Sequence, residues 1–132
     1  KKNYLKGLKK MSKFLELESN VIRWAQERGI FDRGDALAQL DKTEEELDET
    51  IHAVKALQNW EIAMKHDPKN INPETIEHLK NEVADGIGDM LVTIIIAAEM
   101  LNLESIECLQ LAYDEIKDRT GKMVDGQFVK DK

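Results

Sequence analysis

The sequence predicts an all-α fold in which residues 1–132 form one domain shaped like a four-helix bundle. Hydrophobic residues make up 42% of the chain but aromatic residues only 5%, so Leu, Ile, Ala and Met supply most apolar side chains, which suits helices better than sheets. Four principal stretches also carry apolar residues at helical spacing. A chain of 132 residues supports one small core, which we expect oligomerisation to complete.

The N-terminal part is expected to form two short helices. Apolar residues at helical spacing predict one helix over residues 8–17 and another over about residues 21–28. Ser19 or Asn20 is a suitable N-cap for the second helix, and Gly29 is a suitable stop signal. Residues 31–34 are then expected to form a loop.

The middle of the chain is expected to form a long helix followed by a clear break. Asp35 is a suitable N-cap for a helix that continues to about residue 57 or beyond. Residues 65–73 contain Pro and Asn at several positions, which indicates a turn. Asn72 is placed to cap the next helix, and Pro73 is placed to occupy its first position.

A second long helix is expected over residues 73–101, followed by a helix over residues 104–119 and an extended tail after Gly121. Gly86 and Gly88 lie inside the second long helix, where each costs about 1 kcal/mol relative to alanine. The sequence therefore predicts that another helix or a ligand approaches the backbone closely at these glycines.

Composition and charge exclude several classes of function. A formal net charge of -7 argues against binding a nucleic-acid polymer, because phosphate backbones are bound by basic surfaces. The longest apolar run, residues 90–101, is shorter than the roughly 20 residues that a membrane span needs. Cys108 is the only cysteine, so no internal disulfide can form, and we expect a cytoplasmic protein that binds no membrane.

Two acidic clusters lie in the long helices at spacings of three, four and seven residues, so the carboxylates of each cluster share one helix face. Like charges at that spacing destabilise a helix by about 0.2–0.5 kcal/mol per pair, and a bound cation would reverse this effect. Hard divalent cations prefer carboxylate oxygens. The sequence thus predicts Mg²⁺ ligands among Glu45, Glu46, Glu49, Glu82, Asp85 and Asp89.

The two clusters differ in how strongly they indicate a metal. The acidic run at residues 44–46 is typical of a solvated helix face. Asp89 instead precedes an apolar run, and burial of an unpaired carboxylate costs several kcal/mol. With a phosphate substrate, two divalent ions would hold a nucleophilic water and stabilise the transferring group. The reaction class that follows is metal-assisted hydrolysis of a phosphoanhydride.

Several segments resemble the motifs of one known family. Residues 24–30 are similar to its entry segment, and Gln39-x-x-Lys42-x-x-Glu45-Glu46-x-x-Glu49 is similar to its first acidic motif. Its second motif is matched by Glu82-x-x-Asp85, and in another register by Gly88-Asp89 followed by an apolar helix. Residues 113–123 and 126–130 are similar to a basic tail. The family is the MazG-like group of the all-α nucleoside triphosphate pyrophosphohydrolases.

This resemblance implies hydrolysis of a ribo- or deoxyribonucleoside triphosphate between the α and β phosphates, giving the monophosphate and pyrophosphate. It implies Mg²⁺, with Mn²⁺ as an alternative, and a homodimer or homotetramer. The implied metal ligands are Glu45, Glu46, Glu49 and Asp89, assisted by Glu82 and Asp85, and Glu46 also orients or deprotonates the attacking water. The implied substrate-binding residues are Trp24, Gln39, Lys42, Lys117, Arg119 and Lys122.

Two alternatives to such an enzyme remain open. Acidic helix faces would also suit a non-enzymatic interaction protein that binds basic partners. A di-iron carboxylate bundle needs Glu-x-x-His on two helices, but only Glu49-x-x-His52 provides this motif. Some residues also have plainer explanations, since Lys117 and Arg119 suit a helix C-terminus and Trp24 suits a core.

Overall fold

The computed structural model describes residues 2–70 and 72–132. Its elements in chain order are α1 (Lys2–Glu27), α2 (Ile30–Arg33), α3 (Ala36–His66), the 3₁₀ turn η1 (Pro68–Asn70), α4 (Pro73–Met100), α5 (Ser105–Ile116), β1 (Gly121–Val124) and β2 (Gln127–Lys130). The two strands form an antiparallel hairpin, which is the only sheet among the described residues. The prediction of an all-α fold is therefore confirmed.

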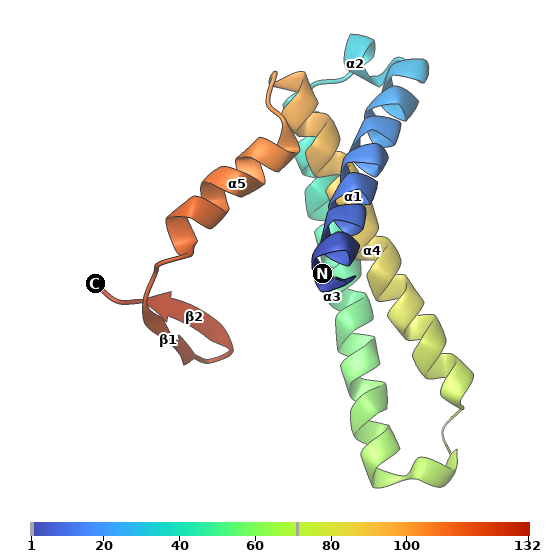
Figure 1. Cartoon of the computed structure of the whole chain (residues 1–132). Coiled ribbons are helices and arrows are strands. Elements are labelled where there is room, and N and C mark those ends of the chain that lie inside the picture. Colours follow the sequence, from blue (N-terminus) through green and yellow to red (C-terminus); the bar gives the residue numbers. More distant parts are fainter. Residues whose placement is uncertain (1, 71) are drawn as a thin grey trace.

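Helices α3 and α4 form an antiparallel pair at the centre of the fold, and α1 packs on α4 (Figure 1). The side chains buried in α4 include Ile76 and Leu79 near its start and Ile95 and Ile96 near its end. Among the described residues, Ile96 is the one large side chain that is almost fully buried, at 2% exposure. The hydrophobic core is therefore small and lies where α1, α3 and α4 pack together.

The predicted start signals of both long helices are confirmed. The Asp35 carboxylate accepts a hydrogen bond from the backbone N–H of Ala38 at 2.9 Å, and the Asn72 side chain accepts one from the N–H of Glu74 at 3.0 Å. These bonds satisfy N–H groups that have no partner within the first helical turn. The predicted break between the helices is also present, although Ile71 within it lies outside the described residues.

The N-terminal region differs from the prediction because α1 is one continuous helix. The Asn20 side chain accepts a hydrogen bond from the Arg23 side chain at 2.6 Å, so it does not start a second helix, and good helix formers continue on both sides. The loop expected over residues 31–34 is also wrong, because α2 occupies most of this segment. Gly29, with a φ of 69° that suits glycine, separates the two helices.

The C-terminal residues 105–130 form an arm, which consists of α5 and the β1–β2 hairpin and leaves the helix pair (Figure 1). α5 begins close to the predicted position but ends at Ile116, three residues early. The tail is extended, as predicted, and it turns at Asp125 and Gly126, whose φ values of 50° and 80° suit a two-residue hairpin turn. The Asp-Gly pair is the sequence signal that would have predicted this hairpin.

The described residues contain no single helix that is long and apolar enough to cross a membrane. Within the described part of the chain, α4 and α5 taken together meet such a test of length and composition, and the two helices are bent by 101° relative to each other.

The two glycines inside α4 have different surroundings. A Cβ built on Gly86 would overlap the Thr50 hydroxyl of α3 and lie 3.1 Å from the Thr50 Cβ, so another helix approaches closely here, as predicted. A Cβ built on Gly88 would meet nothing within 4 Å among the described residues. The predicted close approach is therefore wrong for Gly88 within this chain.

Alanine at these two positions should have opposite effects on stability. Gly86→Ala should lower the free energy of unfolding by about 1–3 kcal/mol, because the added methyl group pushes α3 and α4 apart. Gly88→Ala should raise it by about 0.5–1 kcal/mol, because alanine favours the helix and has free space. Urea denaturation followed by circular dichroism measures both effects. Equal stability of the two variants would contradict the close approach at Gly86.

Candidate functional site

Five of the six predicted acidic ligands line one pocket between α3 and α4. The pocket has a volume of about 250 Å³, and carboxylates from both helices surround it because residues three, four and seven apart share a helix face. Glu82 and Asp85 of one register and Asp89 of the other line it, but Asp89 is exposed, so the expected burial of its carboxylate is wrong. The lining residues are Glu46, Glu49, Thr50 and Ala53 of α3 and Glu82, Asp85, Gly86 and Asp89 of α4.

Thr50 and Gly86 allow the helices to approach closely at this pocket. The Thr50 hydroxyl donates a hydrogen bond to the backbone carbonyl of Glu46 at 2.6 Å, which holds it against its own helix, and Gly86 leaves room for it. Because Thr50 and Gly86 have short side chains or none, they do not fill the pocket between the carboxylates of the two helices. Sequence reasoning identified Gly86 but missed Thr50, although Thr50 lies four residues after Glu46 on the same face.

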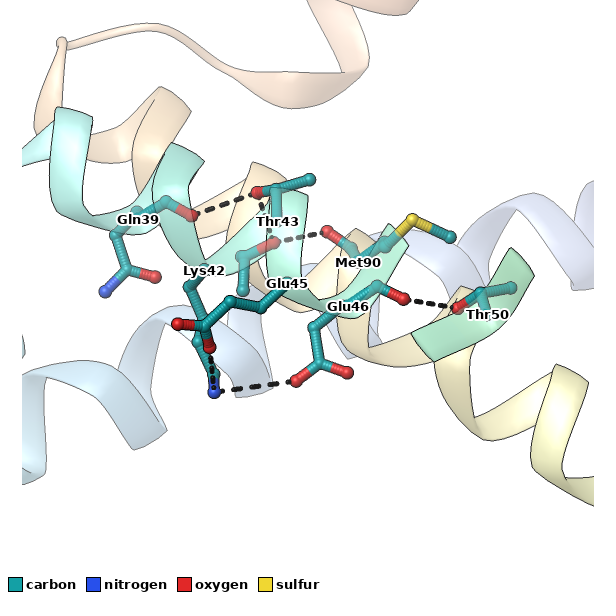
Figure 2. A network of polar contacts seen from close by, with 8 residues as sticks. Gln39, Lys42, Thr43, Glu45, Glu46, Thr50 and Met90 are labelled. Carbon is teal, nitrogen blue, oxygen red and sulfur yellow. Dashed lines mark hydrogen bonds and ion pairs between the residues drawn. The ribbon is translucent and has the colours of Figure 1, made fainter. Parts of the chain in front are cut away.

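The adjacent residues Glu45 and Glu46 have different environments. The Glu46 side chain is 13% exposed and lines the pocket, whereas the Glu45 side chain is 65% exposed and does not line it. Lys42 lies between them, 3.0 Å from a Glu45 oxygen and 3.8 Å from a Glu46 oxygen (Figure 2). The hydrogen bond that Lys42 donates to Glu45, and the charge of Glu45, raise the pKa of Lys42 above its usual value. The structure therefore separates Glu45 from the other predicted ligands.

A contact between two threonine hydroxyls joins α3 to α4 about one turn from the pocket. The Thr43 and Thr93 hydroxyl oxygens are 2.6 Å apart. Each hydroxyl also contacts a carbonyl of its own helix, that of Gln39 at 3.0 Å and that of Met90 at 2.8 Å (Figure 2). Since each hydroxyl has one hydrogen, one donates across the interface and the other donates within its helix. This contact fixes the alignment of the two helices and thus of the pocket carboxylates.

Histidines lie beside the opposite end of the pocket. The His78 Nε2 atom is 3.1 Å from a carboxylate oxygen of Glu82. His52 lines an adjoining hollow of about 400 Å³ together with Glu49 and Glu82, and its Nδ1 atom is 2.8 Å from the carbonyl of Asp48. Two histidines therefore border the acidic site, which the sequence did not predict.

Trp24 and Gln39, which the resemblance assigned to substrate binding, do not line the pocket. Trp24 is 43% exposed, and the Arg28 guanidinium lies 4.5 Å from the centre of its ring, so it belongs neither to the core nor to the acidic site. Gln39 is half-buried, and its backbone carbonyl lies 3.0 Å from the Thr43 hydroxyl. Its observed contact is therefore with the helix rather than with the pocket.

The predicted phosphate-binding cations lie on the arm. Lys117, Arg119 and Lys122 are all exposed, and none of them lines the pocket. Lys117 instead forms an ion pair with Asp114 at 3.6 Å. Within a single chain, the fold does not bring these three cations to the carboxylates, because α5 turns away from the helix pair (Figure 1).

The oxygen donors of the pocket suit a hard divalent cation. Among the described residues, no group of three or more His, Cys, Asp or Glu side chains is gathered closely enough to hold a metal ion. Mg²⁺ commonly takes only one or two carboxylates and completes its shell with waters and substrate phosphates. The described residues therefore form no closed site of protein ligands, and a cation in the pocket would need further ligands.

No family model matches this chain, and searches of curated proteins and of solved structures found no match either. The fold and the pocket thus define the class on their own. The chain is a helical protein with a carboxylate-lined pocket between two antiparallel helices.

The contact between the two threonines should stabilise the helix pair measurably. Thr43→Val and Thr93→Val should each lower the free energy of unfolding by about 1 kcal/mol, because valine keeps the shape of threonine and removes the hydroxyl. The double variant should be about as stable as either single variant, which corresponds to a coupling energy of about 1 kcal/mol. Chemical denaturation of the parent and the three variants measures this cycle. Effects that simply add would show that the hydroxyls do not interact.

Proposed function

We propose that this protein is a Mg²⁺-dependent nucleoside triphosphate pyrophosphohydrolase, which cleaves a ribo- or deoxyribonucleoside triphosphate between the α and β phosphates. The observation that carries the proposal is the pocket of about 250 Å³ that carboxylates of α3 and α4 line together. The similarity of these motifs to the MazG-like family supports the same reaction.

The charge of the pocket determines which ligands it accepts. Its five carboxylates repel one another and also repel a bare triphosphate, so phosphate binds there only with divalent cations between the two. Mg²⁺ in the pocket, or Mn²⁺ in its place, would neutralise phosphate oxygens and assist cleavage as a Lewis acid. The all-oxygen donor set supports this choice of cation.

The carboxylates of the pocket divide into two roles. We assign Glu49, Glu82, Asp85 and Asp89 to holding Mg²⁺, and Glu46 both to this and to orienting the attacking water. Glu46 suits the second role because its side chain is only 13% exposed and lies 3.8 Å from Lys42, which limits its movement. A carboxylate held in this way can accept the proton of the water as it attacks.

The proposal includes an oligomer that acts on free nucleotides in the cytoplasm. The thin core of α1, α3 and α4 supports a homodimer or homotetramer, because a domain of this size buries little apolar surface alone. The net charge of -7 supports small nucleotides rather than a nucleic-acid polymer as substrates. The proposal assigns no membrane partner.

An acidic interaction protein is the second candidate, because the described residues contain no preformed group of three metal ligands. This candidate predicts that pocket carboxylates tolerate neutral substitution and that no nucleotide is hydrolysed. The di-iron alternative is weaker, because Glu49-x-x-His52 has no second Glu-x-x-His motif in the sequence.

Incubation with a panel of ribo- and deoxyribonucleoside triphosphates and Mg²⁺ should release pyrophosphate and no orthophosphate. Glu46→Gln should lower kcat by about 100-fold or more, because a general base contributes roughly 10²–10⁴ in rate. Glu45→Gln is the matched control, since Glu45 is adjacent in sequence but does not line the pocket, and it should keep most of the activity. A chelator should abolish the reaction.

Two results would contradict these assignments. Equal loss of activity in Glu46→Gln and Glu45→Gln would show that position relative to the pocket does not matter. A folded parent protein that hydrolyses no nucleotide would favour the interaction protein.

A further inference from the structure

The chain exposes far more surface than a compact protein of its mass. Its accessible surface is 10904 Å², whereas a compact monomer of 15.1 kDa exposes about 7,100 Å². The difference of about 3,800 Å² exceeds the roughly 1,000–2,500 Å² that each chain contributes to a permanent homodimer. Association with a further chain would cover much of this surface but not all of it.

The arm has little packing within its own chain. Every residue from 107 to 130 is exposed, including Leu109, Tyr113 and Ile116 on one face of α5 and the cross-strand pair Met123 and Phe128 in the hairpin. A helix of 12 residues and a two-stranded hairpin are each marginally stable alone in water. Their apolar faces therefore need a partner surface.

A second copy of this chain also exposes apolar side chains on its helix pair. Apolar side chains at helical spacing form one stripe on α3 and another on α4, and periodicity places both stripes away from the pocket residues. Two copies can therefore pack their helix pairs together and leave both pockets open. The stripes are 41–48% exposed and consist of Leu40, Leu47 and Ile51 on α3 and Ile87, Leu91 and Ile94 on α4.

The charge of residues 117–132, which follow α5, and the length of the arm favour the pocket of the other copy. Residues 117–132 carry five Lys and Arg residues against three Asp residues, whereas the pocket is lined by five carboxylates and by no Lys or Arg. α5 spans about 18 Å and each strand about 13 Å, whereas one helix is about 10 Å thick. An arm of this length can pass one helix layer of a neighbouring copy.

We infer that the arm of each copy crosses to a second copy and places Lys117, Arg119 and Lys122 at the mouth of the acidic pocket there. These cations contact the phosphates of the bound triphosphate, because no Lys or Arg lines the pocket of a single chain. The identity of the ligand rests on the proposed function, whereas the exchange of arms does not depend on it.

Crosslinking of isotopically light and heavy copies tests the exchange without relying on activity. The two forms of the parent protein are mixed, allowed to exchange subunits, and treated with a carbodiimide, which joins lysine to a neighbouring carboxylate. We expect links from Lys122 to Glu49 or Glu82 that join a light copy to a heavy copy. Links confined to single copies, or sedimentation as a 15.1 kDa monomer at every concentration, would overturn the inference.

A mixing experiment tests whether the arm completes the site of the other copy. The arm variant, with Arg119→Ala and Lys122→Ala, should lower kcat/KM about ten- to hundredfold through a higher KM. The pocket variant Asp89→Asn should be nearly inactive. An equal mixture should regain about a quarter of the parent kcat/KM, because half of the dimers are mixed and each of these has one intact pocket with an intact arm.

The control places all three substitutions on one chain and mixes that chain with the parent. If the arms cross, each mixed dimer pairs the intact pocket with the altered arm and is inactive. If each arm serves its own chain, the parent chain of each mixed dimer keeps one working site. No recovery in the first mixture together with working mixed dimers in the second would overturn the inference. A parent that hydrolyses no nucleotide would count against the proposed function instead, and the crosslinks would then decide the exchange of arms.

Discussion

The close approach of α3 and α4 at Gly86 is the constraint on which the rest of the structure depends. A glycine within a helix costs about 1 kcal/mol relative to alanine, and here the bare backbone leaves room for the Thr50 hydroxyl. The contact between Thr43 and Thr93 at 2.6 Å then fixes how the helices align. Carboxylates that lie on separate helices thereby come to border one pocket.

The carboxylates of the pocket place several negative charges close together, and a bound cation would reduce their repulsion. Glu45 outside the pocket has the cation Lys42 at 3.0 Å, as expected for a charge on a helix surface. Among the described carboxylates inside the pocket, Glu46 lies 3.8 Å from the Lys42 ammonium, and Glu82 lies 3.1 Å from a ring nitrogen of His78. Local features that disfavour folding are expected where a ligand binds, because the ligand supplies the missing interaction.

Local patterns in the sequence predicted much of the fold and of the site. Asp35 and Asn72 mark the starts of the long helices because capping depends on neighbouring residues alone, and acidic spacing predicted a shared face. Spacing could not tell which of Glu45 and Glu46 faces the pocket, since adjacent residues differ by about 100° around a helix and the choice depends on where α4 packs. The direction of the arm also escaped prediction, because few contacts within the chain fix it.

The most direct test of the proposed site is to locate where a divalent cation binds. Paramagnetic Mn²⁺, added to isotopically labelled protein with a non-hydrolysable triphosphate analogue, broadens the nuclear magnetic resonance signals of nearby amides. We predict the strongest broadening at Thr50, Gly86 and Asp89, which line the pocket. Broadening spread over exposed acids such as Glu44 and Glu45, with Gly86 unaffected, would contradict a cation site between α3 and α4.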